Sequence, residues 1–435
     1  MTTARVNLWG TSIGAIYWDA QRELGLFEYE PNFLHSGIQI APLQMPLAPT
    51  VYSFPTLNRN TFHGLPGLLA DVLPDRFGNA LIDAWLASLG RTAQSFNPVE
   101  RLCYSGTRGI GALEFMPSMG DAEHQSNRLD VASLVDLAGR IMTQRSSFRA
   151  SLHDGEEGKA LRDILRVGTS AGGARAKAVI AWNPETGEVR SGHANSEKGF
   201  SHWLLKFDGV ASHDGSNLAD SKGYGRIEYA YHLMAMAAGI DMTECQLLHE
   251  NGRSHFVTKR FDRTDSGAKL HQQSLCALAH FDFNMAGAHS YEQAMLVMRQ
   301  LDLPMAAIEQ QFRRAVFNIV ARNQDDHVKN IAFLMDKSGQ WSLSPAYDVT
   351  YSYNPDGSWT SSHQMSLNGK RQGFTHEDFE ACAKTLSMQR THAAAIVEQI
   401  VTAVQQWPAF AATAKVPEAT AAMIAATHRL NLPPA

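Results

Sequence analysis

A short polar run has the residue types and spacing of a phosphoryl-transfer site. Asp325 is followed five positions later by Asn330, and Asp348 comes further along the chain after an apolar segment. Phosphotransferases use such an Asp-to-Asn interval, with a later Asp, to orient an acceptor hydroxyl and to bind magnesium. Hard oxygen donors of this kind are the ligands that Mg²⁺ prefers. The pattern therefore predicts Asp325 as the catalytic base, and Asn330 and Asp348 as metal ligands beside the nucleotide.

Two other interpretations of this run stay open on the residues alone. Asn and Asp favour turns and helix caps, so the run could be a solvated loop. Asp325, Asp326 and His327 could instead serve a metal-dependent phosphoester hydrolase. We expect His327 to stabilise the loop rather than to act in catalysis, because histidines in loops are often structural.

An upstream loop of small residues could bring backbone amides close to a phosphate. It begins at Ser170 and runs into a predicted strand, without the Gly-Lys-Ser/Thr ending of a Walker A loop. An ordinary flexible entry to a hairpin is the alternative. The residues that we assign to nucleotide binding are Ala171, Gly172, Gly173, Ala174 and Lys177.

Two charged residues follow on predicted regular elements. Lys206 lies in a strand predicted over 202–207, and Glu228 lies on a helix predicted over 226–239. The Lys206 ammonium could bind nucleotide phosphates while Glu228 orients it. A solvated lysine and a surface Glu in a first helical turn are the alternatives.

The stretch 256–263 is a candidate hinge. Its backbone would contact the adenine edge near Lys259, with Phe261 packing close by, although an ordinary strand end is equally compatible with the residues.

Composition bounds the class of protein. A chain of 435 residues is expected to form two or three domains. The net charge of −5 disfavours direct nucleic-acid binding without a partner. The four cysteines form no CxxC pair, so we expect free buried thiols in a reducing cytoplasm. No signal segment and no continuous apolar run of membrane-spanning length is evident.

Apolar periodicity and turn residues predict the elements that position these groups. Residues 5–55 read as short strands, and the helical pattern over 67–89 should break at Pro74. Asn97-Pro98 should start a helix, and the glycines from Gly106 should form a turn into a strand. Residues 117–130 are the best candidate linker. Further strands are expected over 176–183, 188–192 and 202–207, and helices over 292–300, 305–322, 376–387 and 391–404.

These motifs together resemble the HipA family of bacterial serine/threonine kinases, the toxins of type II toxin–antitoxin modules. Leu8-Trp9-Gly10 with Gly14, and the stretch 67–75, are similar to the family's N-terminal domain. The kinase core is matched by the stretches 170–177, 261–263, 323–330 and 345–348.

The resemblance implies an α+β, two-lobed kinase fold related to phosphatidylinositol-type kinases. It implies a strand-rich N-terminal region and an all-helical C-terminal lobe, with ATP and Mg²⁺ as co-substrate and cofactor. The expected domains are a HipA-type N-terminal domain over 1–120, a kinase N-lobe over 130–262 and a helical C-lobe over 263–435.

It also implies a substrate, a switch and a partner. The substrate would be a translation protein such as glutamyl-tRNA synthetase, and autophosphorylation of Ser170 would switch the kinase off. A HipB-like helix-turn-helix antitoxin would carry the protein onto operator DNA. A kinase-shaped, non-catalytic partner of such an antitoxin is the alternative.

Overall fold

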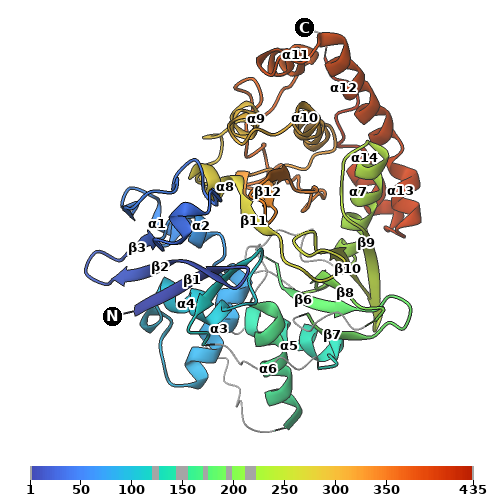
Figure 1. Cartoon of the computed structure of the whole chain (residues 1–435). Coiled ribbons are helices and arrows are strands. Elements are labelled where there is room, and N and C mark those ends of the chain that lie inside the picture. The colour runs from blue at the N-terminus through green and yellow to red at the C-terminus, as the bar shows by residue number, and fades with distance from the viewer. Residues whose placement is uncertain are drawn as a thin grey trace. The chain divides into compact units, whose positions relative to one another are not determined.

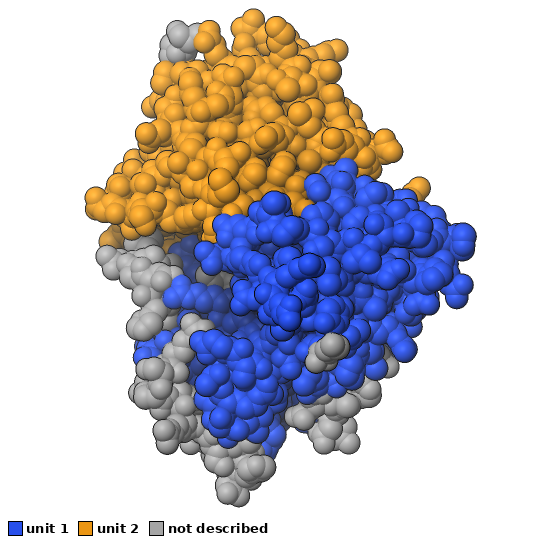
Figure 2. Space-filling view, turned by 90° about the vertical axis from the view of Figure 1, so that its left-hand side faces the viewer, with its two compact units in different colours: residues 1–225, 246–273, 335–339 blue, residues 226–245, 274–334, 340–435 orange. Residues whose placement is uncertain are grey.

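The computed structural model describes residues 2–119, 127–143, 155–169, 175–192, 198–210 and 222–433. Packing divides the chain into two compact units (Figure 2). The first unit comprises residues 1–225, 246–273 and 335–339, and the second comprises residues 226–245, 274–334 and 340–435. The bounds of the three domains expected above stay a prediction. The expected linker 117–130 lies partly outside the described residues.

The first unit opens with an antiparallel sheet of order β4-β3-β2-β1-β5. Alternate residues of β1 face the core, as expected for a half-buried strand. The short strands expected over 5–55 are therefore confirmed. The strands are β1 Thr2–Leu8, β2 Thr11–Asp19, β3 Leu24–Tyr29, β4 Val51–Tyr52 and β5 Leu113–Met116.

Short helices flank this sheet, and their ends follow local chemistry. The break expected at Pro74 separates α2 from α3, and Asp75 caps α3 by accepting a hydrogen bond from the Gly78 amide at 2.7 Å. Asn97 and Glu100 form a capping box at the start of α4. The elements are η1 Phe33–His35, α1 Arg59–Phe62, α2 Gly67–Ala70, α3 Arg76–Ser88, η2 Ala93–Ser95 and α4 Pro98–Ser105.

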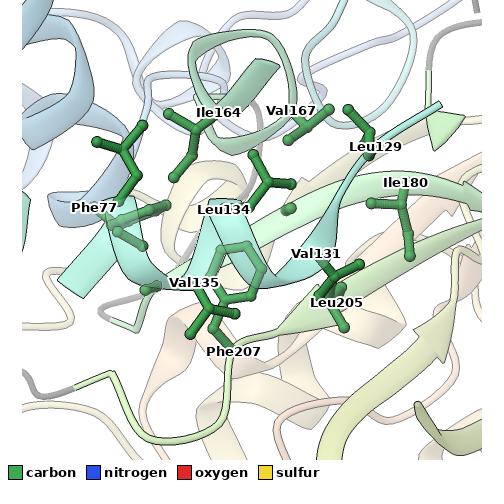
Figure 3. Close-up of a cluster of buried hydrophobic side chains, with 14 of the residues drawn as sticks. Phe77, Leu129, Val131, Leu134, Val135, Ile164, Val167, Ile180, Leu205 and Phe207 are labelled. Carbon is green, nitrogen blue, oxygen red and sulfur yellow. The ribbon is translucent and has the colours of Figure 1, made fainter. Parts of the chain in front are cut away.

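A second sheet of the same unit has the order β7-β6-β8-β10-β9 (Figure 1). Apolar side chains of β6 and β8, among them Ile180 and Leu205, pack with α5, α6 and α3 in one buried cluster (Figure 3). This burial is the main stabilising term for the unit. The elements are α5 Val131–Thr143, α6 Gly155–Gly168, β6 Lys177–Trp182, β7 Val189–Ser191, β8 Ser201–Lys206, β9 Cys245–Glu250 and β10 Arg253–Lys259. The next strand, β11 His271–Ser274, belongs to a third sheet.

The second unit is mainly helical, and its predicted helices are found close to their expected bounds. It is not all helical, because β12 and β13 form a small hairpin. The apolar run 331–335 is buried throughout β12, which suits a short strand better than an amphipathic helix. The elements are α7 Tyr224–Ala237, α8 Leu275–Ala279, α9 Tyr291–Gln300, α10 Met305–Val320, η3 Val328–Asn330, β12 Ala332–Met335, β13 Trp341–Leu343, α11 His376–Thr385, α12 Arg390–Gln405, α13 Trp407–Thr413 and α14 Glu418–Ala425.

All four cysteines are free and buried, as expected. Within the described ranges, no helix has the length and apolar character needed to cross a membrane.

Candidate active site

The β12–β13 hairpin places the two predicted metal ligands at one end of a single motif. The Ser344 amide donates to the Ala332 carbonyl at 3.0 Å, which pairs the start of β12 with the residue that follows β13. Asn330 immediately precedes this hairpin and Asp348 soon follows it. Because adjacent strands joined by a short turn run antiparallel, these two residues leave the hairpin at the same end.

Hydrogen bonds to backbone carbonyls hold the segment around Asp348 along the polar loop. The Tyr347 hydroxyl donates to the Lys329 carbonyl at 2.7 Å, and the Ser352 amide donates to the Arg322 carbonyl at 3.1 Å. Asp348 itself has φ of 55°, in the left-handed region. Non-glycine residues in this region are uncommon, although Asp tolerates it, and such strain concentrates at functional sites. The chain therefore holds Asp348 next to residues 323–330.

Asn330, a predicted metal ligand, is hydrogen-bonded to Asp325, the predicted base. Its Nδ2 donates to the backbone carbonyl of Asp325 at 2.8 Å, which directs the amide nitrogen into the loop. The amide oxygen is the atom suited to a cation, and with the Asp348 carboxylate it gives two hard ligands. Among the described residues, no cluster of three His, Cys, Asp or Glu side chains is placed to hold a metal. Two protein ligands fit Mg²⁺, which completes its shell with water and phosphate oxygens.

Asp325 is the accessible carboxylate of the pair Asp325-Asp326. Its side chain is 41% exposed, and its Oδ1 accepts a hydrogen bond from Trp359 Nε1 at 2.6 Å. His327 Nε2 lies 3.7 Å from the same oxygen. The His327 ring has Phe283 at 5.4 Å and Trp359 at 6.4 Å between ring centroids, in line with a structural role. The arrangement leaves Asp325 able to meet a substrate.

Asp326 has the opposite environment. Both its oxygens are engaged: Oδ2 accepts from the Tyr291 hydroxyl at 2.6 Å and from His363 Nδ1 at 2.7 Å, and Oδ1 accepts from the Gln364 amide at 2.7 Å. Its side chain is fully buried. The hydrolase that would use Asp325, Asp326 and His327 together is therefore not supported, because Asp326 cannot reach a ligand.

An arginine from the end of the chain fixes the tautomer of His363. Arg429 Nη1 lies 2.8 Å from His363 Nε2, and since a guanidinium only donates, Nε2 must accept. The proton therefore sits on Nδ1 and faces Asp326, and burial lowers the pKa of His363. Burial opposes ionisation of Asp326, but the contacts with His363, Tyr291 and the Gln364 amide hold its pKa below the ordinary value. A neutral His363 thus bridges two charged groups.

Lys206 and Glu228 are both buried, with 8% and 2% exposure. The solvated lysine and the surface Glu that the sequence allowed are therefore wrong, because each charge has been removed from water. Lys206 Nζ lies 5.7 Å from the Phe256 ring centroid. Lys206 belongs to the first unit and Glu228 to the second, so their ion pair stays a prediction.

The remaining predicted nucleotide-binding residues have mixed placements. Lys177 is buried in β6, with Nζ 3.9 Å from Asp75 Oδ2, and Lys259 forms an exposed ion pair with Asp265 at 3.0 Å. Phe261 is half-buried just after β10. Residues that lie outside the described part of the chain are Ser170, Ala171, Gly172, Gly173 and Ala174.

The stretch 261–263, which resembles the kinase core, also fixes a turn of the N-terminal segment. Asp262 Oδ2 accepts from the Gly111 amide at 2.7 Å, and Arg263 Nη1 donates to the Gly111 carbonyl at 3.2 Å. Gly106 and Gly111 both have positive φ, which confirms the structural turn expected there.

Two protein families match segments of the chain. Residues 4–116 match the family described as HipA N-terminal domain, and residues 169–407 match the HipA-like C-terminal domain. No curated protein matches the sequence.

Solved structures that are similar to the chain include the following two. The Shewanella oneidensis MR-1 toxin–antitoxin system of HipA, HipB and operator DNA contains a chain with 19% identity and a TM-score of 0.67, covering 97% of this chain and 94% of that chain. A Helicobacter pylori proinflammatory kinase, CtkA, has 11% identity and a TM-score of 0.32, covering 52% of this chain and 90% of that chain. The first likeness establishes the mixed α+β fold.

Proposed function

The chain belongs to the HipA family, and from this premise we propose that it is an ATP-dependent protein kinase that phosphorylates serine or threonine. One observation carries the proposal. The backbone carbonyl of Asp325, whose carboxylate is accessible, accepts a hydrogen bond from the Asn330 side chain, and Asp348 is held beside the same loop. Such a set suits phosphoryl transfer, in which positioning and charge neutralisation do most of the work.

Each residue has a defined task in this proposal. Asp325 accepts the proton of the acceptor hydroxyl. Asn330 and Asp348 hold Mg²⁺, which neutralises charge on the phosphates. Lys206 contacts the nucleotide phosphates and Glu228 orients its ammonium. Both charges are buried, and isolated charges are rarely removed from water.

The test of the proposal is Asp325→Asn. The variant should fold and bind ATP with Mg²⁺ as the wild type does, while transfer falls by about 10²-fold or more because the base is lost. Asp336→Asn, in the exposed turn between β12 and β13, is the matched control and should transfer normally. Full activity in Asp325→Asn would contradict the assignment. Magnesium-dependent ATP binding by a wild type that transfers nothing would favour the non-catalytic regulatory partner.

We further propose that phosphorylation of Ser170 switches the kinase off. A phosphate there adds about −2 charge within a loop meant for an anionic nucleotide. Arg175, five positions after Ser170, stacks on Tyr224 with 3.5 Å between its guanidinium carbon and the ring centroid. Mass spectrometry of wild type and Ser170→Ala after incubation with ATP tests the switch. An active wild type that remains unmodified at Ser170 would refute it.

The proposed substrate is a translation protein such as glutamyl-tRNA synthetase, and the proposed partner is a HipB-like antitoxin. The similar Shewanella oneidensis structure supports the partner, because it contains HipA with HipB and operator DNA. The net charge of −5 is consistent with DNA contact through a partner. A phosphoproteomic comparison of the wild type with Asp325→Asn should reveal the substrate, and co-purification with the protein should reveal the antitoxin.

A further inference from the structure

Trp359 contacts the carboxylate on which the proposed reaction depends. Its indole Nε1 donates to Asp325 Oδ1 at 2.6 Å, across 34 positions of sequence. An indole nitrogen can only donate, so Asp325 Oδ1 must be the acceptor of this hydrogen bond. His327 Nε2 is 3.7 Å from the same oxygen. Both neighbours therefore lie on the Oδ1 side of the carboxylate.

The loop that carries Trp359 is fixed to the polar run by several bonds. The Asn354 amide donates to the Thr360 carbonyl at 3.3 Å, and Gln324 Nε2 donates to the same carbonyl at 3.0 Å. Gln364 donates its side-chain amide to the Trp359 carbonyl and its backbone amide to Asp326 Oδ1. The loop that holds the indole against Asp325 is therefore itself hydrogen-bonded, through Gln364, to the carboxylate of Asp326.

We propose that Trp359 is a positioning residue that holds Asp325 so that Oδ2 is presented to the acceptor hydroxyl. The proposal rests on the proposed kinase function. In the transfer step the hydroxyl proton passes to Oδ2, the hydroxyl oxygen bonds to the γ-phosphorus, and the bond from that phosphorus to the oxygen of ADP breaks. Trp359 touches none of the reacting atoms and acts only through Asp325.

A locked carboxylate is useful because the terminal torsion of Asp is broad and roughly two-fold. A 41% exposed side chain without this bond would sample many orientations. Small misplacements of a reacting group have large effects on rate. Nucleotide binding should not depend on the bond, because its ligands are other residues of the site.

The experiment removes the N–H and keeps the ring. Trp359 is replaced by Phe, and separately by 3-(3-benzothienyl)alanine, which has sulfur in place of the indole nitrogen. With ATP and Mg²⁺ alone, phosphate incorporated into the chain and inorganic phosphate released are both measured. We expect kcat to fall about tenfold with KM for ATP unchanged, in line with loss of an oriented base. Trp359→His, which can restore a ring N–H, should recover part of the loss.

Trp341→Phe, in β13 of the same unit, is the matched control and should keep the wild-type kcat. Wild-type kcat in both Trp359 variants would overturn the proposal while the kinase function stands. A tenfold rise in KM for ATP with unchanged kcat would overturn it too, because such a change indicates altered ATP binding. If the wild type neither incorporates nor releases phosphate, the proposed function itself fails.

Discussion

At the scale of single residues, the pair Asp325-Asp326 shows how environment divides two identical side chains. Asp325 is 41% exposed, whereas Asp326 is completely buried. Asp326 receives hydrogen bonds on both oxygens, so it can hold the loop but cannot accept a proton from a substrate. The carboxylate that we propose to react, Asp325, thus lies next to one that is fully engaged in holding the loop.

Asp326→Ala should therefore destabilise the second unit strongly. It removes the anion that His363 and Tyr291 face, leaving buried donors without an acceptor. Loss of one member of a buried charged network costs about 3–5 kcal/mol. Chemical denaturation followed by tryptophan fluorescence measures the free energy of unfolding. Asp325→Asn serves as the comparison and should change it little, so equal losses in the two variants would contradict the division of roles.

Sequence reasoning could propose Asp325, Asn330 and Asp348 as site residues because the interval between them reflects chemistry. It could not identify Trp359, since nothing in a loop of Pro, Gly and Ser indicates that an indole will reach a carboxylate far away in sequence. It also could not divide the roles of Asp325 and Asp326. Burial depends on tertiary packing, which no local pattern records.

At the scale of elements, a buried charge cluster joins the turn before β5 to the segment after β10. Asp262 pairs with Arg260 at 2.6 Å and with Arg263 at 2.8 Å, and it also accepts from the Gly111 amide. Burial opposes ionisation, yet the two guanidinium groups hold the pKa of Asp262 well below its usual range. This cluster links the N-terminal family segment to the C-terminal one inside the first unit.

We expect Asp262→Ala to cost about 3–5 kcal/mol of unfolding free energy, because two buried guanidinium groups lose their counter-charge. Asp265→Ala is a matched control from the same stretch. Its carboxylate is 93% exposed in an ion pair with Lys259, so its loss should stay within experimental error. Urea denaturation of both variants measures the difference. Equal stabilities would mean that the Asp262 cluster does not hold the turn.

Most elements could be predicted because their signals are local. Pro74 breaks a helix and Asn97-Pro98 starts one, and neither effect needs the rest of the fold. The β12–β13 hairpin was missed inside a region expected to be all helical. Its first strand, β12, is short and fully buried, and periodicity alone cannot separate such a run from a helix.

At the scale of the whole molecule, both units hold buried or half-buried histidines. Burial lowers the pKa of His271 in the first unit to about 4, and it does the same for His280 and His428 in the second. An unfolded histidine has a pKa of about 6.5. Between these values the unfolded chain binds protons that the folded chain does not, so unfolding becomes more favourable as the pH falls.

The chain should therefore lose stability in mild acid, well before its carboxylates are protonated. The contribution of each of these histidines is fully present above about pH 6.5 and declines toward pH 4, by about 1–2 kcal/mol at pH 5. Urea midpoints measured from pH 7.5 to pH 5 should fall steadily. His428→Gln should flatten this slope, whereas His35→Gln, at an exposed position, should leave it unchanged. A midpoint constant over this range would mean that these imidazoles take up protons in the folded chain, which their burial opposes.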